Sequence, residues 1–312
     1  MSTAFPDAST VIDGDVVRGA VRHPRQMLAD QEYDGHASVH DESVAGDLGL
    51  SGAPIEGPTH FSQFDPLAFE WWGDRWFAEG RISAHFQTMV VEGESVSATA
   101  RRAGDDIARI DAAKTDGTPV LTGTVSVGAG VTTELGERVA TMQARDPGEL
   151  FIVDQLSVGD RVAAPAPVSI DMDTPNGHLY PFSLRQKLDA ITEPSPWYES
   201  GDNPWGRPIV PIEMISVLSG KGGGGFPVRG PAVGLFVDLE VGLVNGPLFV
   251  GEEYLLEREV VAIGQSRRVE SYWVLTTVTR AATGEHAADV LLHSGTFKAS
   301  YAEYPADRLE ST

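Results

Sequence analysis

The sequence predicts an α+β protein built from two copies of one plan, a buried helix wrapped by an antiparallel β-sheet. First, residues 57–72 and 208–220 each carry apolar side chains at helical spacing with almost no polar face. Second, each of these segments is followed by strand-length pieces separated by glycine-containing turns. Third, short echoes such as GAPIEGP at 52–58 and GRPIVPI at 206–212 indicate an internal duplication.

The first predicted helix, GPTHFSQFDPLAFEWW at 57–72, has apolar residues at positions 61, 64, 67, 68, 71 and 72. This spacing indicates a mostly buried helix, and its aromatic side chains are expected in the core. Pro58 suits a first helical turn because its missing N–H would be unpaired there. Pro66 lies inside the pattern and predicts a kink or a break.

Strands are predicted where apolar and polar residues alternate between glycine-containing turns. In 80–91, for example, Ile82, Ala84 and Phe86 alternate with Arg81, Ser83 and His85. The predicted strand segments are 80–91, 91–104, 106–117 and 118–130 in the first half, and 229–243, 248–264, 265–284 and 286–301 in the second. Each half therefore has a helix followed by a meander of four strands.

The chain is long enough for two cores, and we expect two domains. Residues 1–130 form the predicted N-terminal domain and residues 206–312 the C-terminal domain. The linker between them, 131–205, is rich in Pro, Gly and Asn, which predicts loops with only short regular pieces.

Composition and charge exclude several classes of function. The 45 Asp and Glu against 23 Lys and Arg give a net charge of −22, which repels nucleic-acid phosphates and anionic lipids, so neither is an expected partner. The absence of Cys excludes disulfides, thiolate zinc sites and cysteine nucleophiles. No signal-peptide pattern and no run of about 18 apolar residues occurs, which predicts a cytoplasmic protein outside the membrane.

The stretch DGHASVHDESVAG at 34–46 places two histidines and three acidic residues close together. It begins a pattern that runs to the helix entry through Asp34, Asp41, Ala45, Gly49, Ile55 and Gly57. In this spacing the chain resembles the MaoC-like hydratase/dehydratase family. The resemblance implies a double hotdog fold, no cofactor, and hydration or dehydration of an enoyl or 3-hydroxyacyl thioester of CoA or of acyl carrier protein.

The resemblance also assigns candidate catalytic residues, in the first half of the chain. The family's catalytic Asp corresponds to Asp34, whereas its catalytic His position holds Val39. His40 and His36 lie on either side, and we consider His40 first because a loop shift of one residue would bring it to the place of Val39. The His that usually precedes the helix-entry Gly is Glu56 here, which makes Glu56 a further candidate.

Hydration of an enoyl thioester also needs donors that hold the charge on the thioester oxygen. A backbone N–H at a helix N-terminus suits this role. Gly57 is the natural donor and the Thr59 N–H an alternative, since Pro58 cannot donate. His60 comes next and either points at the thioester or serves the start of the helix.

Other interpretations stay open. The stretch 34–46 also fits a strand end and a helix start whose first Asp caps a turn. His36 and His40 with a carboxylate would suit a metal, although H-x-x-x-H without a third ligand is weak and we expect no metal. The missing histidines also fit a degenerate protein that binds an acyl thioester or a partner subunit. A thioesterase, with Glu56 or Asp65 activating water, is the third alternative, and a homodimer is also considered.

Two other motifs carry no predicted chemistry. SGDNP at 200–204 looks like the start of a family signature, but it lies too close to the second helix entry and is interpreted as a turn. KGGGG at 221–225 lacks the spacing of a phosphate-binding loop. We expect it to be a loop after the second helix that flanks an acyl channel.

Overall fold

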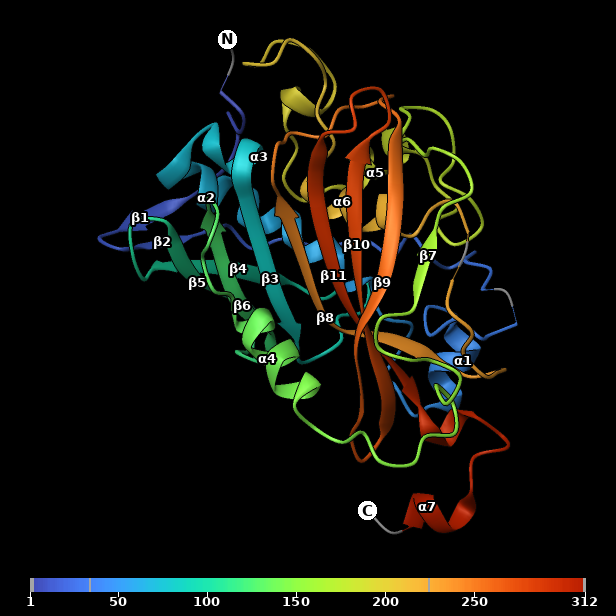
Figure 1. Ribbon diagram of the computed structural model, residues 1–312. Helices are drawn as coiled ribbons and strands as arrows, with labels where there is room; N and C mark the ends of the chain where they lie inside the picture. The colour runs from blue at the N-terminus through green and yellow to red at the C-terminus, as the bar shows by residue number, and fades with distance from the viewer. Residues whose placement is uncertain (1–2, 34, 224, 311–312) are drawn as a thin grey trace.

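The computed structural model describes residues 3–33, 35–223 and 225–310, and its centre is one large antiparallel sheet (Figure 1). The strands are β1 (Val11–Asp13), β2 (Val16–Arg18), β3 (Gly80–Phe86), β4 (Val96–Arg102), β5 (Ile107–Lys114), β6 (Pro119–Val127), β7 (Arg161–Ala163), β8 (Gly234–Leu243), β9 (Tyr254–Gln265), β10 (Val269–Arg280) and β11 (His286–Phe297). They pair in the order β1-β2-β4-β5-β6-β3-β8-β11-β10-β9-β7. Each predicted strand segment thus contains one strand.

Helical elements in the described part of the chain are short. They are α1 (Glu42–Asp47), the 3-10 helix η1 (Gly57–Phe64), α2 (Asp65–Trp72), α3 (Arg75–Glu79), α4 (Glu134–Gln143), α5 (Leu184–Ala190), the 3-10 helix η2 (Pro196–Tyr198), α6 (Ile212–Ser219), the 3-10 helix η3 (Lys298–Ser300) and α7 (Ala306–Glu310). The linker at 131–205 contains α4, β7, α5 and η2, so it is mostly irregular as expected but holds one helix of ten residues.

The predicted helix 57–72 is interrupted. It begins as η1 and continues as α2, with Pro66 in the first turn of α2. A proline cannot donate to the preceding turn, so the change of helix type falls where Pro66 predicts a break. The second predicted helix is the eight-residue α6. The expectation of one long central helix in each half is therefore not confirmed.

The two halves of the sheet join through β3 and β8. These strands pair antiparallel from Arg81 with Gly242 to His85 with Asp238. Helices cover both faces of the sheet: Figure 1 shows α4 in front of it and α5 and α6 behind it. Behind the sheet, η1 contacts α6 directly. The first-half strands, the second-half strands and both helical segments therefore enclose one interior.

One large hydrophobic cluster contains buried residues from both halves of the chain, beside two smaller clusters. Phe61 and Phe64 of η1 are fully buried, and they belong to the same cluster as Ile215 of α6 and Leu239 of β8. Trp76 is also fully buried and Trp72 nearly so, as the sequence predicts. Burial of these apolar side chains stabilises the contact between the halves.

One buried carboxylate anchors the linker to the second half of the sheet. Glu270, at the start of β10, is fully buried. Its oxygens accept hydrogen bonds from the backbone N–H groups of Phe151, Ile152 and Val153 at 2.8–3.2 Å. These fixed donors replace the hydrogen bonds that the carboxyl group would otherwise make with water.

Candidate active site

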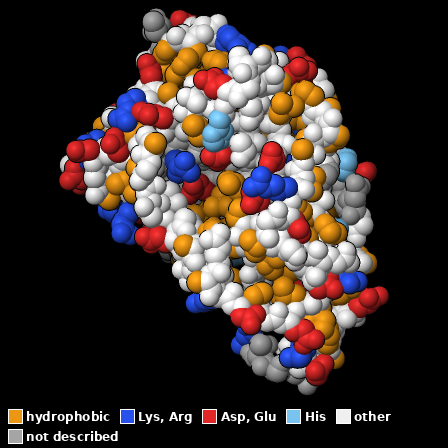
Figure 2. Space-filling model, viewed as in Figure 1, with side chains coloured by type: hydrophobic (Ala, Val, Ile, Leu, Met, Phe, Trp, Pro, Cys, Tyr) orange, Lys and Arg blue, Asp and Glu red, His pale blue; other side chains and the backbone are white. Residues whose placement is uncertain are grey.

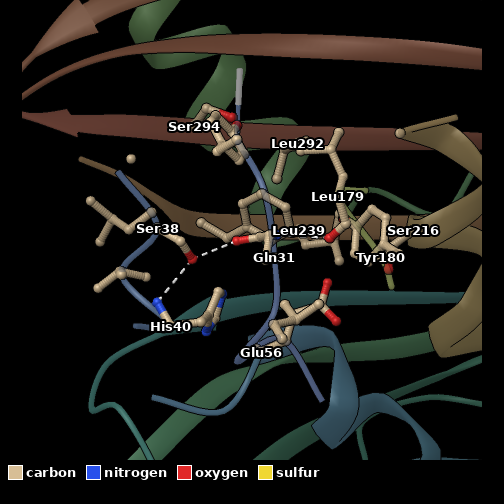
Figure 3. Close-up of a pocket in the computed structure, with 18 of the residues that line it drawn as sticks. Gln31, Ser38, His40, Glu56, Leu179, Tyr180, Ser216, Leu239, Leu292 and Ser294 are labelled. Carbon is tan, nitrogen blue, oxygen red and sulfur yellow. Dashed lines mark hydrogen bonds between the residues drawn. The ribbon is translucent and has the colours of Figure 1, made fainter. Parts of the chain in front are cut away.

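A cavity of about 680 Å³ lies between the entry to η1 and the strands of the second half. Its apolar wall comes from both halves, with Phe86, Val90 and Val120 on one side and Leu235, Leu239 and Leu292 on the other. The cavity is therefore complete only when both halves are in place. Its lining also includes several polar side chains, which Figure 3 shows around the loop that carries His40.

His40 lines this cavity and is held in one orientation. The Ser38 hydroxyl donates to Gln31 at 2.7 Å and accepts from the His40 N–H at 3.1 Å, which orders the loop (Figure 3). The Nδ1 atom of His40 lies 2.7 Å from the carbonyl oxygen of Pro54. A carbonyl only accepts, so Nδ1 carries the proton and Nε2 is left as a base. Burial lowers the pKa of His40, which keeps the ring neutral.

His36 lies in another part of the same cavity. Its Nδ1 is 3.3 Å from the carbonyl oxygen of Ala232, and its ring meets Tyr33 edge-on. His40 instead contacts Pro54, three residues before Gly57, and so lies nearer the helix entry. Asp34, the first candidate base, lies outside the described residues. Val39 is buried and lines the cavity, so neither histidine displaces it.

Glu56 is a buried carboxyl group on the cavity wall. Only 7% of the residue is exposed, and Figure 3 shows the side chain turned toward Tyr180. Burial, and more weakly the charge of Glu213, raise the pKa of Glu56 to about 7, against the opposing effects of Lys187 and Tyr180. Glu56 therefore keeps its proton up to neutral pH, unlike an ordinary glutamate.

The backbone at the start of η1 offers one donor to a ligand. No described residue accepts a hydrogen bond from the Gly57 N–H, and Gly57 lines the cavity. A Cβ at this position would come within 2.8 Å of the Phe86 ring, so any other residue would force that ring to shift. The alternative donor is excluded: the Thr59 N–H already donates to the Glu56 carbonyl at 3.1 Å.

His60 is buried and also lines the cavity. Its Nδ1 lies 3.1 Å from the amide nitrogen of Gln63, which donates, so the ring proton is on Nε2. Burial, together with the nearby Lys187, lowers the pKa of His60 to about 4. His60 is thus a neutral ring that bonds to Gln63 within η1 and carries its N–H on Nε2.

Asp65, the other carboxylate considered for a thioesterase, lies in the core and does not line the cavity. Its two oxygens accept hydrogen bonds from the Trp76 indole at 2.9 Å and the Tyr198 hydroxyl at 3.0 Å. Burial raises the pKa of Asp65 to about 8. Asp65 holds α2 against its neighbours and cannot activate a water molecule in the cavity.

Asp65→Asn is expected to flatten the dependence of stability on pH. The folded pKa of Asp65 lies above its ordinary value, so between about pH 4 and about pH 8 the folded state holds one more proton than the unfolded state. Stability therefore falls as pH rises through this window, by up to about 1.4 kcal/mol per unit. Asparagine cannot ionise, and it keeps an acceptor for Trp76 and a donor for Tyr198.

The measurement is the unfolding free energy in urea at several pH values. Asp47→Asn, an exposed substitution on α1, serves as the matched control and should keep the wild-type slope. An unchanged slope in Asp65→Asn would show that Asp65 does not hold a proton in the folded state.

Several site residues escape prediction from sequence. Tyr180 and Lys187 come from the linker, and Glu213 and Ser216 from α6. Two signals point to them in retrospect. Lys187 is one of four lysines in the chain, and Glu213 is a single acidic residue inside an apolar helix. The two loop interpretations agree with the structure, since 200–204 forms a turn and Lys221 follows α6 at the cavity wall.

The structure gives no support to a metal site at the two histidines. His36 and His40 point to different backbone carbonyls. Within 3–33, 35–223 and 225–310, no three His, Asp or Glu side chains gather in a way that would hold a metal ion. In the same part of the chain, every helix is too short or too polar to cross a bilayer.

No family model matches the chain, and no curated protein matches it by sequence. Solved structures do match. A MaoC domain protein of Chloroflexus aurantiacus, to which dehydratase activity has been ascribed, superposes with a TM-score of 0.54 at 15% identity, covering 95% of this chain and 97% of the other. A conserved Mycobacterium tuberculosis protein with a double hotdog fold, essential for bacterial survival during infection, superposes with a TM-score of 0.55 at 9% identity and the same coverage.

At these identities the likeness shows the fold alone. The chain has the double hotdog fold, and the resemblance to MaoC-like proteins is confirmed at that level. The chemistry must be argued from the residues of the cavity.

Proposed function

We propose that this protein hydrates or dehydrates an enoyl or 3-hydroxyacyl thioester of CoA or of acyl carrier protein, in the cavity beside Gly57. One observation carries the proposal: a neutral His40 and a protonatable Glu56 line the same cavity as the Gly57 N–H, from which no described residue accepts a hydrogen bond. Two groups whose surroundings move their pKa values apart are the usual mark of a base and an acid. In this proposal residues 1–130 and 206–312 are the two hotdog units, joined by 131–205.

The residues support a simple course for dehydration. Nε2 of His40 removes a proton from the α-carbon, and the electrons move onto the thioester oxygen, where the Gly57 N–H stabilises the charge. The electrons then move back from the thioester oxygen, so the double bond between the α- and β-carbons forms and the bond between the β-carbon and its hydroxyl breaks. Glu56 donates its proton to that hydroxyl, so water departs while His40 holds one proton more and Glu56 one fewer. Hydration is the reverse.

The rival functions receive less support. A thioesterase needs a carboxylate that activates water, but Asp65 is enclosed in the core and Glu56 is protonated up to about pH 7. A degenerate protein that only binds a thioester is the other rival. It is suggested by Val39 in the place of a histidine, but His40 supplies an imidazole one residue later.

The test is an assay of the purified protein with 2-enoyl-CoA thioesters of short, medium and long chain. We expect enoyl absorbance to fall without release of free thiol. Release of thiol would instead identify a thioesterase. Binding of every thioester without any turnover would identify a degenerate protein.

His40→Asn is expected to lower kcat/KM by about 10²–10⁴-fold, the usual contribution of a general base. The asparagine amide still donates to the Pro54 carbonyl, so the loop should keep its shape. His36→Asn is the matched control, since His36 also lines the cavity but lies against Ala232, and its rate should stay within a few-fold of wild type. Equal losses in both variants would contradict the assignment of His40.

A further inference from the structure

A buried group of three ionisable side chains lies at the wall of the cavity. Glu56 precedes η1, Lys187 is on α5, and Glu213 is on α6; each is more than nine-tenths buried. The ammonium of Lys187 lies 3.4 Å from a carboxylate oxygen of Glu213 and donates to the Thr59 hydroxyl at 3.1 Å. Of the three, only Glu56 lines the cavity.

This group contains more acidic side chains than basic ones. Two carboxylates and one ammonium would leave a net negative charge in the interior, which is costly without water. One carboxyl group should therefore keep its proton. Lys187 makes its ionic contact with Glu213, so the proton falls to Glu56.

The other groups that face Glu56 do not supply a compensating positive charge. Tyr180 approaches from the linker with a neutral hydroxyl, and burial raises the pKa of that hydroxyl further. His60 on η1 and His40 on the neighbouring loop are both neutral rings, since burial lowers the pKa of each. Lys187 is thus the one cation among the described residues that interact with Glu56.

We propose that Glu213 is a positioning residue that holds the ammonium of Lys187, so that Glu56 faces the cavity as a protonated acid. The use of that proton rests on the proposed function, whereas the protonation of Glu56 does not. The two can therefore fail separately.

This arrangement predicts opposite effects for two related variants. In Glu213→Gln, Lys187 loses its partner, and Glu56 is the remaining buried carboxyl near it. Glu56 should then ionise to pair with Lys187. In the double variant Lys187→Met/Glu213→Gln, neither charge is present, and Glu56 should hold its proton at least as firmly as in the wild type.

The experiment is infrared absorption of the protonated carboxyl group as a function of pH. Subtraction of the Glu56→Gln spectrum assigns the signal to Glu56. We expect a midpoint of about 7 in the wild type. In Glu213→Gln the midpoint should fall by at least about one unit, which is about a tenfold loss of protonated Glu56 at a fixed pH above the midpoint. The double variant should return to the wild-type midpoint or above it.

Glu213→Asp is the conservative control, because it keeps a carboxylate for Lys187 and should stay near the wild-type midpoint. Circular dichroism checks that each variant is folded. Should Glu213→Gln fail to fold, an ionised Glu56 in Glu213→Asp or in the double variant would still overturn the proposal. An unchanged midpoint in Glu213→Gln, or an ionised Glu56 in the double variant, would overturn the proposal.

The readout also separates this inference from the proposed function. If the midpoints move as expected but no enoyl thioester is turned over, the function is wrong and the role of Glu213 stands. If turnover occurs but the midpoints stay constant, the function stands and the role of Glu213 is wrong. When both hold, the alkaline limb of the rate profile should shift with the infrared midpoint in Glu213→Gln.

Discussion

Replacing Glu56 with glutamine is expected to lower kcat/KM for dehydration of a 3-hydroxyacyl thioester by about 10²–10⁴-fold. Glutamine has nearly the same shape as a protonated glutamate but cannot give a proton to the departing hydroxyl. The cavity should therefore still bind the thioester, and KM should change little while kcat falls. Steady-state kinetics, with a binding measurement for the thioester, test this expectation.

The dependence of the dehydration rate on pH should also differ between the wild type and Glu56→Gln. Dehydration needs Glu56 protonated, so the wild-type rate should decline as pH rises through about 7. It also needs His40 neutral, so the rate should decline on the acid side below the ordinary range of histidine, because burial lowers the pKa of His40. Glu56→Gln should lose the alkaline limb and keep the acid limb.

Glu42→Gln on the exposed face of α1 is the matched control and should leave both limbs unchanged. An alkaline limb that persists at the same pH in Glu56→Gln would assign it to another group. Full activity in this variant would remove Glu56 from the reaction.

Glu270→Ala is expected to lower the free energy of unfolding by about 3–5 kcal/mol. The substitution leaves the N–H groups of the buried Ile152 and Val153, and of the half-buried Phe151, without their acceptor. Each unpaired buried donor carries a desolvation penalty of about 1–3 kcal/mol. Denaturation in urea measures the loss.

Glu257→Ala provides the control for this substitution. Glu257 lies on the neighbouring strand β9, but its side chain is exposed, so its removal should change stability by no more than about 0.5 kcal/mol. Hydrogen exchange adds a local readout, because the amides of 151–153 should exchange faster in Glu270→Ala. Equal stability losses in the two variants would show that the anchor contributes little.

The sheet could be predicted from sequence far better than the helices could. Alternation between glycine turns is a local signal, and it located β3 to β6 in the first half and β8 to β11 in the second. The spacing of 57–72 indicated burial and a break at Pro66, but it could not distinguish a 3-10 turn from an α-helix. Two short strands near the N-terminus were missed, although the Asp-Gly pair at their turn is a hairpin signal. Helix α4 was hidden by the Pro and Gly content of the segment around it.

Only some residues of the candidate site could be predicted from the sequence. His40, Glu56 and Gly57 lie within one short stretch, so a motif could identify them. The charged residues that surround them could not be identified from a motif. Lys187 reaches Thr59 across 128 positions of the chain, and Glu213 joins them only because α6 contacts η1. Protonation depends on such neighbours, so the stretch alone left open whether Glu56 was an acid or a remnant.

The pairing of β3 with β8 has a consequence for synthesis of the protein. As the chain leaves the ribosome, β3 is an edge strand with open hydrogen-bonding groups until the linker has passed and β8 arrives. During that interval the apolar residues of η1 also lack the cover of α6. Until α6 and β8 have been made, the nascent first half is thus a surface on which chaperones would act and neighbouring chains would pair.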